Sequence, residues 1–330
     1  MACALNESPR LNKISDAQKD PACPVCGGTT RIFYRLQRHA CKARRCRSCG
    51  YVWIDPPLRG ADAEYLDHYQ QPAYSECVAV MDTTKYQVHL AHIQESVDLA
   101  TAPNKRALEI GSSYGHMLDL LAGQGFAVEG IELLHGGVAA SRARGLTIHS
   151  VPFEEFKAGE PFGLVLSTHV VEHLRDIHGY FRKTSELLAP GGYSILLTPN
   201  ADATLFKVLR QFWAGATPDE HNLFLSFRAA RLLAAQYGFE VVALRTTGRY
   251  WSTVRGVLAE GYHVVKARRA KSAAPSSAGT PGQAAHRRPG RRDAIFKLIA
   301  RIESPFLTVL HRLLARCGRS DELLAVFRKK

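Results

Sequence analysis

Short apolar runs alternate with amphipathic stretches through the middle of the chain. The runs are short and lie next to Gly or polar residues, so they predict strands at 107–110, 127–131 and 146–149. Apolar residues at helical spacing predict the intervening helices at 114–122 and 137–144. This alternation predicts an α/β fold with a doubly wound, mostly parallel sheet, which binds its ligand at the carboxyl ends of the strands.

The turn between the first strand and the first helix carries two glycines, Gly111 and Gly115, and Glu109 lies just before them. A dinucleotide site has three glycines that let a pyrophosphate rest on the helix N-terminus, and a carboxylate here would repel that group. A cationic nucleoside such as S-adenosylmethionine suits the acid better. Glu132 ends the next strand, where a carboxylate can accept hydrogen bonds from both ribose hydroxyls. An α/β unit without a nucleotide is an equal alternative for the two glycines alone, and the two acids make it less favourable.

Four separated segments, at 105–121, 165–176, 186–200 and 220–239, occur in the order found in class I S-adenosylmethionine-dependent methyltransferases. The chain resembles the small-molecule branch of this family, which includes ubiquinone-biosynthesis-type enzymes. Residues 109–115 look like the family's motif I, and Glu132 looks like its ribose-binding acid. The resemblance implies a seven-stranded, mostly parallel Rossmann-like sheet. Its last strand, at 321–330, would be inserted antiparallel after a helical insertion.

The same resemblance implies which residues surround S-adenosylmethionine. The expected cofactor-binding residues are Glu109, Gly111, Ser112, Gly115, Glu132, Leu133, Ser150 and Thr168. Ser150 follows the third strand, where the family places residues near the adenine, and Thr168 ends the fourth. Gly163 stands where most relatives have Asp, which weakens the local match without touching the cofactor site.

Two histidines are candidate catalytic bases. His169 follows the fourth strand and is expected to face the transferring methyl group, where a base with a pKa of about 6.5 can take a proton from a hydroxyl. A hydrogen-bonded loop histidine is the more frequent alternative. His221 lies in a Glu-His-Asn segment that relatives place over the acceptor. The Glu172-His173 pair resembles a family pair that we interpret as structural, and the aromatic residues near Trp213 suit either a core or a substrate wall.

Two Cys-x-x-Cys knuckles precede this region. They are formed by Cys23, Cys26, Cys46 and Cys49. Two knuckles at this spacing predict a zinc ribbon, because each places two thiolates on one tight turn and Zn²⁺ takes four ligands. Disulfides are the weaker alternative, and His39 or Cys41 could substitute as a ligand. Similar ribbons contact RNA in some ribosomal RNA methyltransferases and close over the substrate in some sugar methyltransferases.

The net charge of +13 is concentrated in two segments. Residues 23–50 hold seven Arg or Lys and residues 266–292 hold eight, without an acid in either, so the rest of the chain carries −2. The central region is therefore not a basic surface typical of nucleic-acid binding. Apolar residues at helical spacing predict basic amphipathic helices at 294–316. They suit packing on the protein's own core, a dimer contact, or an anchor at an anionic membrane surface through 266–317.

The expected organisation has six parts. They are a disordered N-terminus at 1–20, a zinc ribbon at 21–55, a helical cap at 56–100, the methyltransferase core at 101–247, a basic flexible insertion with amphipathic helices at 248–320, and the last core strand at 321–330. The N-terminal residues lack the apolar segment of a signal peptide, and no apolar stretch is long enough to span a membrane. A cytoplasmic location is expected, with peripheral contact at the inner face of the membrane as an alternative.

The sequence predicts a methyltransferase that uses S-adenosylmethionine and carries a structural Zn²⁺. O-methylation of a small or carrier-linked acceptor, such as a cell-surface glycan or a secondary metabolite, is the first hypothesis, because histidine bases are available. An RNA methyltransferase that contacts phosphates through the ribbon and the basic loop is the second. A cofactor-binding protein without catalysis is the third. The acceptor, the atom that is methylated and the oligomeric state do not follow from the sequence.

Overall fold

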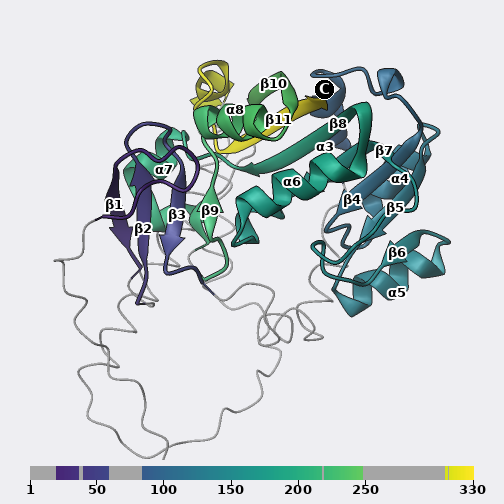
Figure 1. The fold of residues 1–330 in the computed structure, drawn as a ribbon, viewed down its shortest axis with the longest axis horizontal. Coiled ribbons are helices and arrows are strands. Elements are labelled where there is room, and N and C mark those ends of the chain that lie inside the picture. The colour runs from purple at the N-terminus through teal and green to yellow at the C-terminus, as the bar shows by residue number, and fades with distance from the viewer. Residues whose placement is uncertain (1–19, 37–39, 59–83, 218, 248–308, 311) are drawn as a thin grey trace, which may run out of the picture.

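The computed structural model describes residues 20–36, 40–58, 84–217, 219–247, 309–310 and 312–330 (Figure 1). The expected disordered N-terminus, most of the helical cap and most of the insertion lie outside the described residues. The described part contains a large central sheet covered by helices and a small sheet near the N-terminus.

The central sheet has seven strands in the order β10-β11-β8-β7-β4-β5-β6. Their bounds are β4 (Arg106–Ile110), β5 (Ala127–Ile131), β6 (Thr147–His149), β7 (Phe162–Thr168), β8 (Leu188–Pro199), β10 (Phe239–Thr247) and β11 (Glu322–Lys329). All neighbours pair in parallel except β11, which is antiparallel to both β8 and β10. The predicted seven-stranded, mostly parallel sheet with a last antiparallel strand is confirmed.

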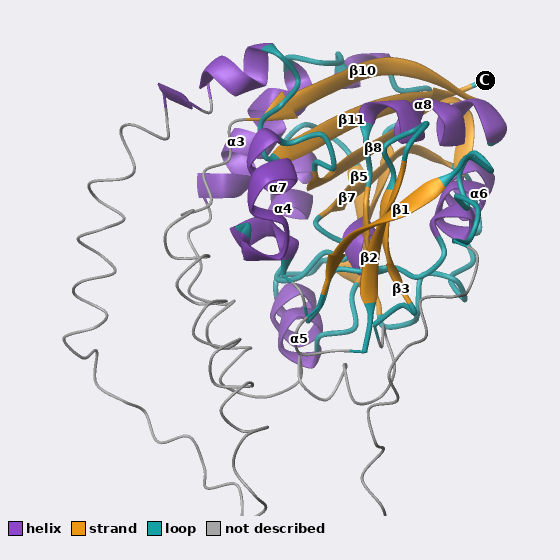
Figure 2. Ribbon diagram, turned by 90° about the vertical axis from the view of Figure 1, so that its left-hand side faces the viewer, coloured by secondary structure: helices purple, strands orange, loops and turns teal. Residues whose placement is uncertain are grey.

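Helices cover both faces of this sheet, as Figure 2 shows with α3 and α4 on one side and α6 on the other. The helices are α3 (Thr84–Gln94), α4 (His116–Ala122), α5 (His135–Ala143), α6 (Ile177–Leu187), α7 (Thr204–Leu209) and α8 (Phe227–Gln236). Successive side chains of β4 point to opposite faces of the sheet. Ala107 shares an apolar cluster with α3 and α4 on one face, and Leu108 shares one with α6 and α8 on the other. Within the segment expected as a helical cap at 56–100, α3 ends at Gln94, and a short 3₁₀ turn follows at Leu99–Thr101.

Residues 189–192 form a bulge inside β8. The register of β7 and β8 jumps from Phe162 opposite Leu188 to Leu164 opposite Tyr193. Between them, a Cβ on Gly163 would lie 2.2 Å from the carbonyl oxygen of Asn104. The backbone therefore leaves no room for the Asp that relatives carry at this position.

The small sheet contains β1 (Thr30–Arg35), β2 (Lys42–Cys46), β3 (Val52–Asp55) and β9 (Leu223–Phe224). The first three strands lie in the segment predicted as a zinc ribbon, and the fourth comes from the chain between β8 and α8. The two segments share one apolar cluster, in which Phe33 and Ile54 pack with Phe206, Trp213 and Phe224. The N-terminal unit is therefore built into the central domain, and it appears beside α7 and β9 in Figure 1.

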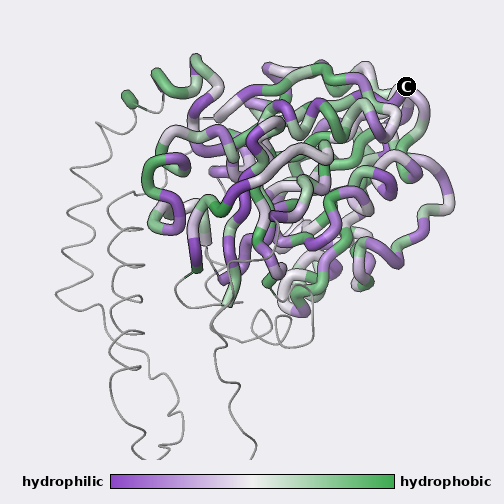
Figure 3. Tube along the Cα trace, turned by 60° about the vertical axis from the view of Figure 1, so that its left-hand side comes forward, coloured by the Kyte–Doolittle hydropathy of each residue, from purple (hydrophilic) through white to green (hydrophobic). Residues whose placement is uncertain are grey.

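The end of the insertion is helical, as predicted, at residues 309–310 and 312–316. The side chains of Val309 and Leu313 are 57% and 54% exposed, and green segments mark this helix in Figure 3. Its last turn is fixed to the sheet, because Thr246 donates a hydrogen bond to the carbonyl of Ala315 at 3.2 Å. Within the described ranges, no helix is both long enough and apolar enough to cross a membrane.

Candidate functional site

The loop between β4 and α4 depends on its two glycines. Gly111, Ser113 and Gly115 have positive φ angles of 71°, 49° and 73°. A Cβ on Gly111 would lie 2.4 Å from Cγ2 of Val170, and a Cβ on Gly115 would lie 2.6 Å from Cδ1 of Leu146. The loop is therefore held against Val170 after β7 and against Leu146 before β6, and no larger residue fits at either glycine without movement.

Glu132 lies at the end of β5 beside this loop, as predicted. Its carboxylate accepts hydrogen bonds from the backbone N–H groups of Ser113 at 2.5 Å and of Leu133 and Leu134 at 2.7 Å. Burial raises the pKa of Glu132, and these backbone donors oppose the rise. A carboxylate has about four acceptor positions, so three backbone donors still leave capacity for a ligand hydroxyl.

Three polar atoms at this end of the sheet are buried and have no hydrogen-bond partner in the described part of the chain. They are Oε2 of Glu109, Oγ of Ser112 and Oγ1 of Thr168. Burial, together with the charge of Glu132, raises the pKa of Glu109 well above its usual range. Buried polar groups are normally satisfied, so these atoms indicate a place for a polar ligand, and a cationic group would suit the acid. S-adenosylmethionine, with its ammonium and sulfonium, fits this set of residues.

The remaining predicted cofactor residues surround the same edge. Leu133 follows Glu132 and is half-buried, and Ser150 is exposed just after β6. The structure thus brings all eight residues to the carboxyl ends of β4, β5, β6 and β7, where a doubly wound sheet binds ligands.

His169 lies directly after β7 with a positive φ of 56°. Its Nδ1 is 3.1 Å from Oε1 of Glu172, and its Nε2 is 2.7 Å from Oε1 of Glu322. Burial lowers the pKa of His169, but hydrogen bonds to the two carboxylates raise it, and the net pKa is about 9. An imidazolium cannot accept a proton, so this environment does not favour His169 as a general base at neutral pH.

His221 is buried away from solvent. Its Nδ1 donates to the carbonyl of Gly215 at 3.0 Å, and its ring lies 4.8 Å from the ring of His173. Burial and the neighbouring His173 lower the pKa of His221 to about 3. So low a pKa makes His221 a weak base, and its contacts are those of a structural side chain.

The Glu172-His173 segment is a junction between the central sheet and the chain before α8. Thr198 donates to Oε2 of Glu172 at 2.9 Å. Asn222 binds both residues through its backbone and its side chain, with distances of 2.7 Å to the Glu172 carbonyl and 3.0 Å to the His173 carbonyl. These contacts match the structural role that the sequence suggested for the pair.

The four knuckle cysteines form one cluster, with all Sγ atoms within 4.8 Å of one another. Cys23 and Cys49 are 3.6 Å apart, and Cys26 and Cys46 are 3.5 Å apart. Four thiolates around one tetrahedral Zn²⁺ with Zn–S bonds of 2.3 Å would lie about 3.8 Å apart. The cluster therefore has the dimensions of a zinc site, and Cys41 does not belong to it.

Sequence reasoning missed two side chains that reach this region. His89 on α3 and Glu322 at the start of β11 lie with Nε2 and Oε1 3.7 Å apart, beside His169. The one available signal was an acid at the start of an otherwise apolar strand. Their approach to His169 is a product of the tertiary fold.

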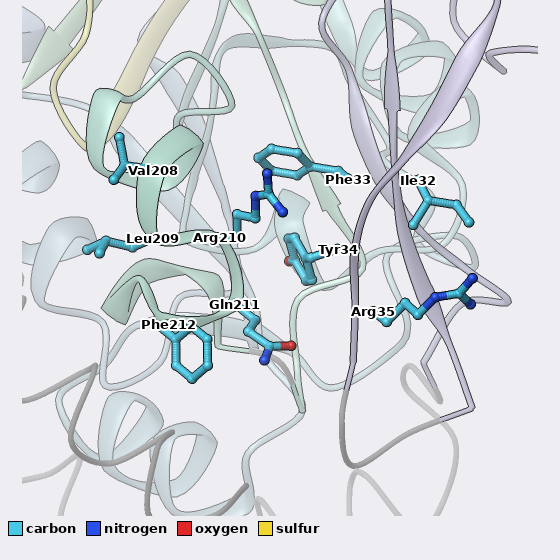
Figure 4. Close-up of a pocket in the computed structure, with 9 residues that line it drawn as sticks. All are labelled: Ile32, Phe33, Tyr34, Arg35, Val208, Leu209, Arg210, Gln211 and Phe212. Carbon is cyan, nitrogen blue, oxygen red and sulfur yellow. The ribbon is translucent and has the colours of Figure 1, made fainter.

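An open cavity of about 560 Å³ lies elsewhere, between β1 and the turn after α7 (Figure 4). It is lined by Ile32, Phe33, Tyr34, Arg35, Val208, Leu209, Arg210, Gln211 and Phe212. None of these residues belongs to the loop at Gly111 or to its neighbours, so the cavity is separate from the candidate cofactor site.

Comparison with known proteins agrees with this geometry. Residues 85–244 match the family model described as a methyltransferase domain. The ubiquinone biosynthesis O-methyltransferase of Ruegeria pomeroyi is 36% identical over 102 residues, which cover 29% of this chain and 41% of the relative. The one from Bordetella pertussis is 28% identical over 127 residues, covering 36% of this chain and 52% of the relative. The chain thus spans about half or less of the length of these curated relatives.

A solved structure shows the same fold at low identity. Phosphoethanolamine N-methyltransferase 2 of Haemonchus contortus, in complex with S-adenosyl-L-methionine, aligns with a TM-score of 0.53 and 15% identity. The alignment covers 82% of this chain and 60% of that one.

Proposed function

We propose that this chain, whose residues 85–244 form a class I S-adenosylmethionine-dependent methyltransferase domain, transfers a methyl group to an oxygen of a small or carrier-linked acceptor. S-adenosylmethionine would supply a methyl group on a positively charged sulfur. The observation that carries the proposal is the combination of a glycine loop with the buried acid Glu109 and the strand-end acid Glu132.

Each acid would serve a different part of the cofactor. Glu132 would accept hydrogen bonds from the ribose hydroxyls, while Glu109 would stabilise the positive charge of the amino acid portion. Ser112 and Thr168 have buried hydroxyls that could complete these contacts. Gly111 and Gly115 give the loop its shape, because a Cβ at either position would collide with Val170 or Leu146.

A small acceptor is favoured by the surroundings of the site. The curated relatives are named as ubiquinone biosynthesis O-methyltransferases, which supports oxygen as the methylated atom. Phe206 and Trp213, considered from sequence as either core or substrate wall, are almost completely buried. They belong to the core, and the acceptor would be held near the end of β7. Aligning the acceptor oxygen with the methyl group in a site that excludes water would supply most of the rate enhancement.

The RNA alternative is less favoured by the charges of the N-terminal unit. Arg44 pairs with Asp20 at 2.6 Å and Asp55 at 2.5 Å, and Arg45 pairs with Asp202 at 3.3 Å. The side chains of both arginines are about nine-tenths buried. These cations therefore stabilise the protein itself and are not displayed toward a phosphate backbone.

The proposal includes one structural Zn²⁺ held by Cys23, Cys26, Cys46 and Cys49. Contacts from the core reach both knuckles: His178 Nε2 lies 3.0 Å from the carbonyl of Pro24, and Arg228 donates to the carbonyl of Ser48 at 3.0 Å. The ion would fix the ribbon against α6 and α8, so its contribution would be to folding.

A methyl-transfer assay tests the function directly. The full chain would be incubated with S-adenosylmethionine carrying a labelled methyl group and with three fractions of a cell extract: small molecules, lipid-linked molecules and RNA. We expect label in one of the first two fractions and its loss with Glu109→Gln. Label in the RNA fraction alone would select the RNA methyltransferase, and binding without transfer to any fraction would select the non-catalytic protein.

A further inference from the structure

Three potential metal ligands from distant parts of the chain meet beside the candidate site. They are His89 on α3, His169 after β7 and Glu322 at the start of β11, and one ligand atom of each lies within 4.8 Å of the other two. Oε1 of Glu322 lies 2.7 Å from Nε2 of His169 and 3.7 Å from Nε2 of His89. Both imidazoles therefore face the same carboxylate oxygen.

Neighbouring side chains orient two of the three. Nδ1 of His169 is 3.1 Å from Oε1 of Glu172, so its other nitrogen is directed at Glu322. The hydroxyl of Thr247 donates to Oε2 of Glu322, which leaves Oε1 between the histidines. A carboxylate behind a histidine is the arrangement that fixes metal-ligating imidazoles in proteins. The left-handed backbone at His169 holds the ring in this position.

Burial and charge also suit a cation. The side chains of His89 and Glu322 are 4% and 1% exposed, whereas that of His169 is 23% exposed. The cluster is thus closed on two sides and open on the third. Glu172 and Glu322 are both completely buried, and two buried carboxylates need compensating positive charge. Without a metal, protonated His169 lies between these two carboxylates, and a divalent ion bound by neutral imidazoles could take the place of that proton.

We infer that Nε2 of His89, Nε2 of His169 and Oε1 of Glu322 bind a divalent transition metal such as Mn²⁺ or Fe²⁺. Imidazole and carboxylate ligands suit these ions, and two histidines with one carboxylate leave coordination positions open. His169, the partly exposed ligand, is joined to Val170, which packs against Gly111 in the loop between β4 and α4, so the cluster and the candidate cofactor site are neighbours. An acceptor oxygen could occupy an open position, where the ion would make its hydroxyl more acidic. This role rests on the proposed function, whereas metal binding itself does not.

Titration of the full chain with Mn²⁺, followed by electron paramagnetic resonance of the free ion, tests the site while the cysteine cluster keeps its own metal. We expect one Mn²⁺ per chain, and His89→Gln and Glu322→Gln should each weaken its binding by more than about tenfold. The matched control is His92→Gln on the same helix, because His92 is partly exposed and pairs with Glu95. It should bind Mn²⁺ as the wild type does.

A neighbouring cluster supplies the competing outcome. Glu172, His173 and His221 also lie within 4.8 Å of one another, so loss of Mn²⁺ with His221→Gln but not with His89→Gln would overturn the assignment. Absence of Mn²⁺ binding by the wild type would also overturn it.

If His89→Gln does not fold, Thr247→Val removes only the hydroxyl bonded to Glu322 and should still weaken Mn²⁺ binding about tenfold. Unchanged affinity in that variant would contradict the site. Calorimetry with S-adenosylhomocysteine in the absence of Mn²⁺ separates the two proposals, because failure of that binding would count against the methyltransferase function alone.

Discussion

Glu109 lies at the end of β4 so close to Glu132 at the end of β5 that the charge of Glu132 adds to burial in raising the pKa of Glu109. The usual pKa of a glutamate is about 4.3. Between that value and the raised pKa, the unfolded chain has lost this proton while the folded chain keeps it. Glu109 therefore lowers the free energy of unfolding as the pH rises through this window.

A cationic ligand should offset the cost of ionising buried Glu109. Because S-adenosylmethionine favours the ionised form of Glu109, its affinity should rise with pH in the same window by up to about tenfold per pH unit, and its binding should release a proton. Calorimetry in buffers of different ionisation enthalpy measures that proton. Glu109→Gln should bind more weakly and without this pH dependence. A wild type whose affinity is the same throughout the window would show that Glu109 does not meet the cation.

Removal of Glu132 should weaken cofactor binding. Glu132→Ala loses charge-assisted hydrogen bonds to the ribose, which should cost about 1–3 kcal/mol of binding free energy. Part of the loss will come from the loop, because the same carboxylate binds the backbone of Ser113. Isothermal calorimetry gives the cost, and Glu155→Ala, an exposed acid beyond β6, is the control. Equal affinities of the two variants would remove Glu132 from the ribose site.

Substitution of Gly111 should combine a steric and a conformational cost. Gly111→Ala would place Cβ 2.4 Å from Cγ2 of Val170 at a φ of 71°. Gly125→Ala isolates the conformational part, because its φ is 83° and no atom lies within 4 Å of the added Cβ. That part should be about 1–2 kcal/mol of unfolding free energy.

Denaturant unfolding of five proteins completes this prediction. They are the wild type, Gly125→Ala, Gly111→Ala, Val170→Ala and the double variant at Gly111 and Val170. Gly111→Ala should cost more unfolding free energy than Gly125→Ala, and this difference should be smaller when Val170 is also Ala. If Gly111→Ala costs no more than Gly125→Ala, the close contact with Val170 is not present in solution.

The cysteine cluster should contain one zinc per chain. Cys23→Ser with Cys26→Ser should remove it and lower the melting temperature, because Cys23, Cys46 and Cys49 pack against Leu223 and Ala229 of the core. Atomic absorption of purified protein measures the metal. Cys41→Ser is the control. Because Cys41 lies outside the cluster, this variant should keep its zinc. Purified wild-type protein that contains no zinc would rule out the zinc ribbon.

Membrane contact through 266–317, one of three alternatives for this segment, can be tested at its described end. Val309 and Leu313 expose their apolar side chains on the short helix before β11. If this segment lies on an anionic surface, the full chain should sediment with anionic vesicles, and Val309→Glu with Leu313→Glu should reduce that sedimentation while leaving cofactor binding unchanged. Equal sedimentation by both proteins would leave packing or dimerisation as the role of the insertion.

Local patterns predicted the elements whose residues carry their own signal. The strand, glycine loop and helix from β4 to α4 follow from apolar spacing and two glycines, and the last strand was found across a long insertion. The bulge in β8 is set by its register with β7, which shifts between Phe162 and Leu164, and such a pairing leaves no local signal in the sequence. Nor could the sequence predict that β9, only two residues long, would join the N-terminal sheet.

The environment of the candidate catalytic residues was equally non-local. His169 was correctly placed after β7, but its two carboxylate partners determine its charge, and one of them, Glu322, lies on the last strand. His221 was expected over the acceptor, but burial and the hydrogen bond to Gly215 make it a structural residue.

The pairing of β3 with β9 also constrains the order in which the protein can mature. Val52 pairs with Phe224, so the small sheet of the N-terminal unit cannot be completed until the ribosome has made β9, which follows five of the seven strands of the central sheet. Pairings between such distant residues close a large loop and slow folding. The cysteines of the N-terminal unit would therefore leave the ribosome early and stay exposed until residues 222–226 have been made. A fragment of this protein that ended at residue 58 would lack the strand that closes the small sheet.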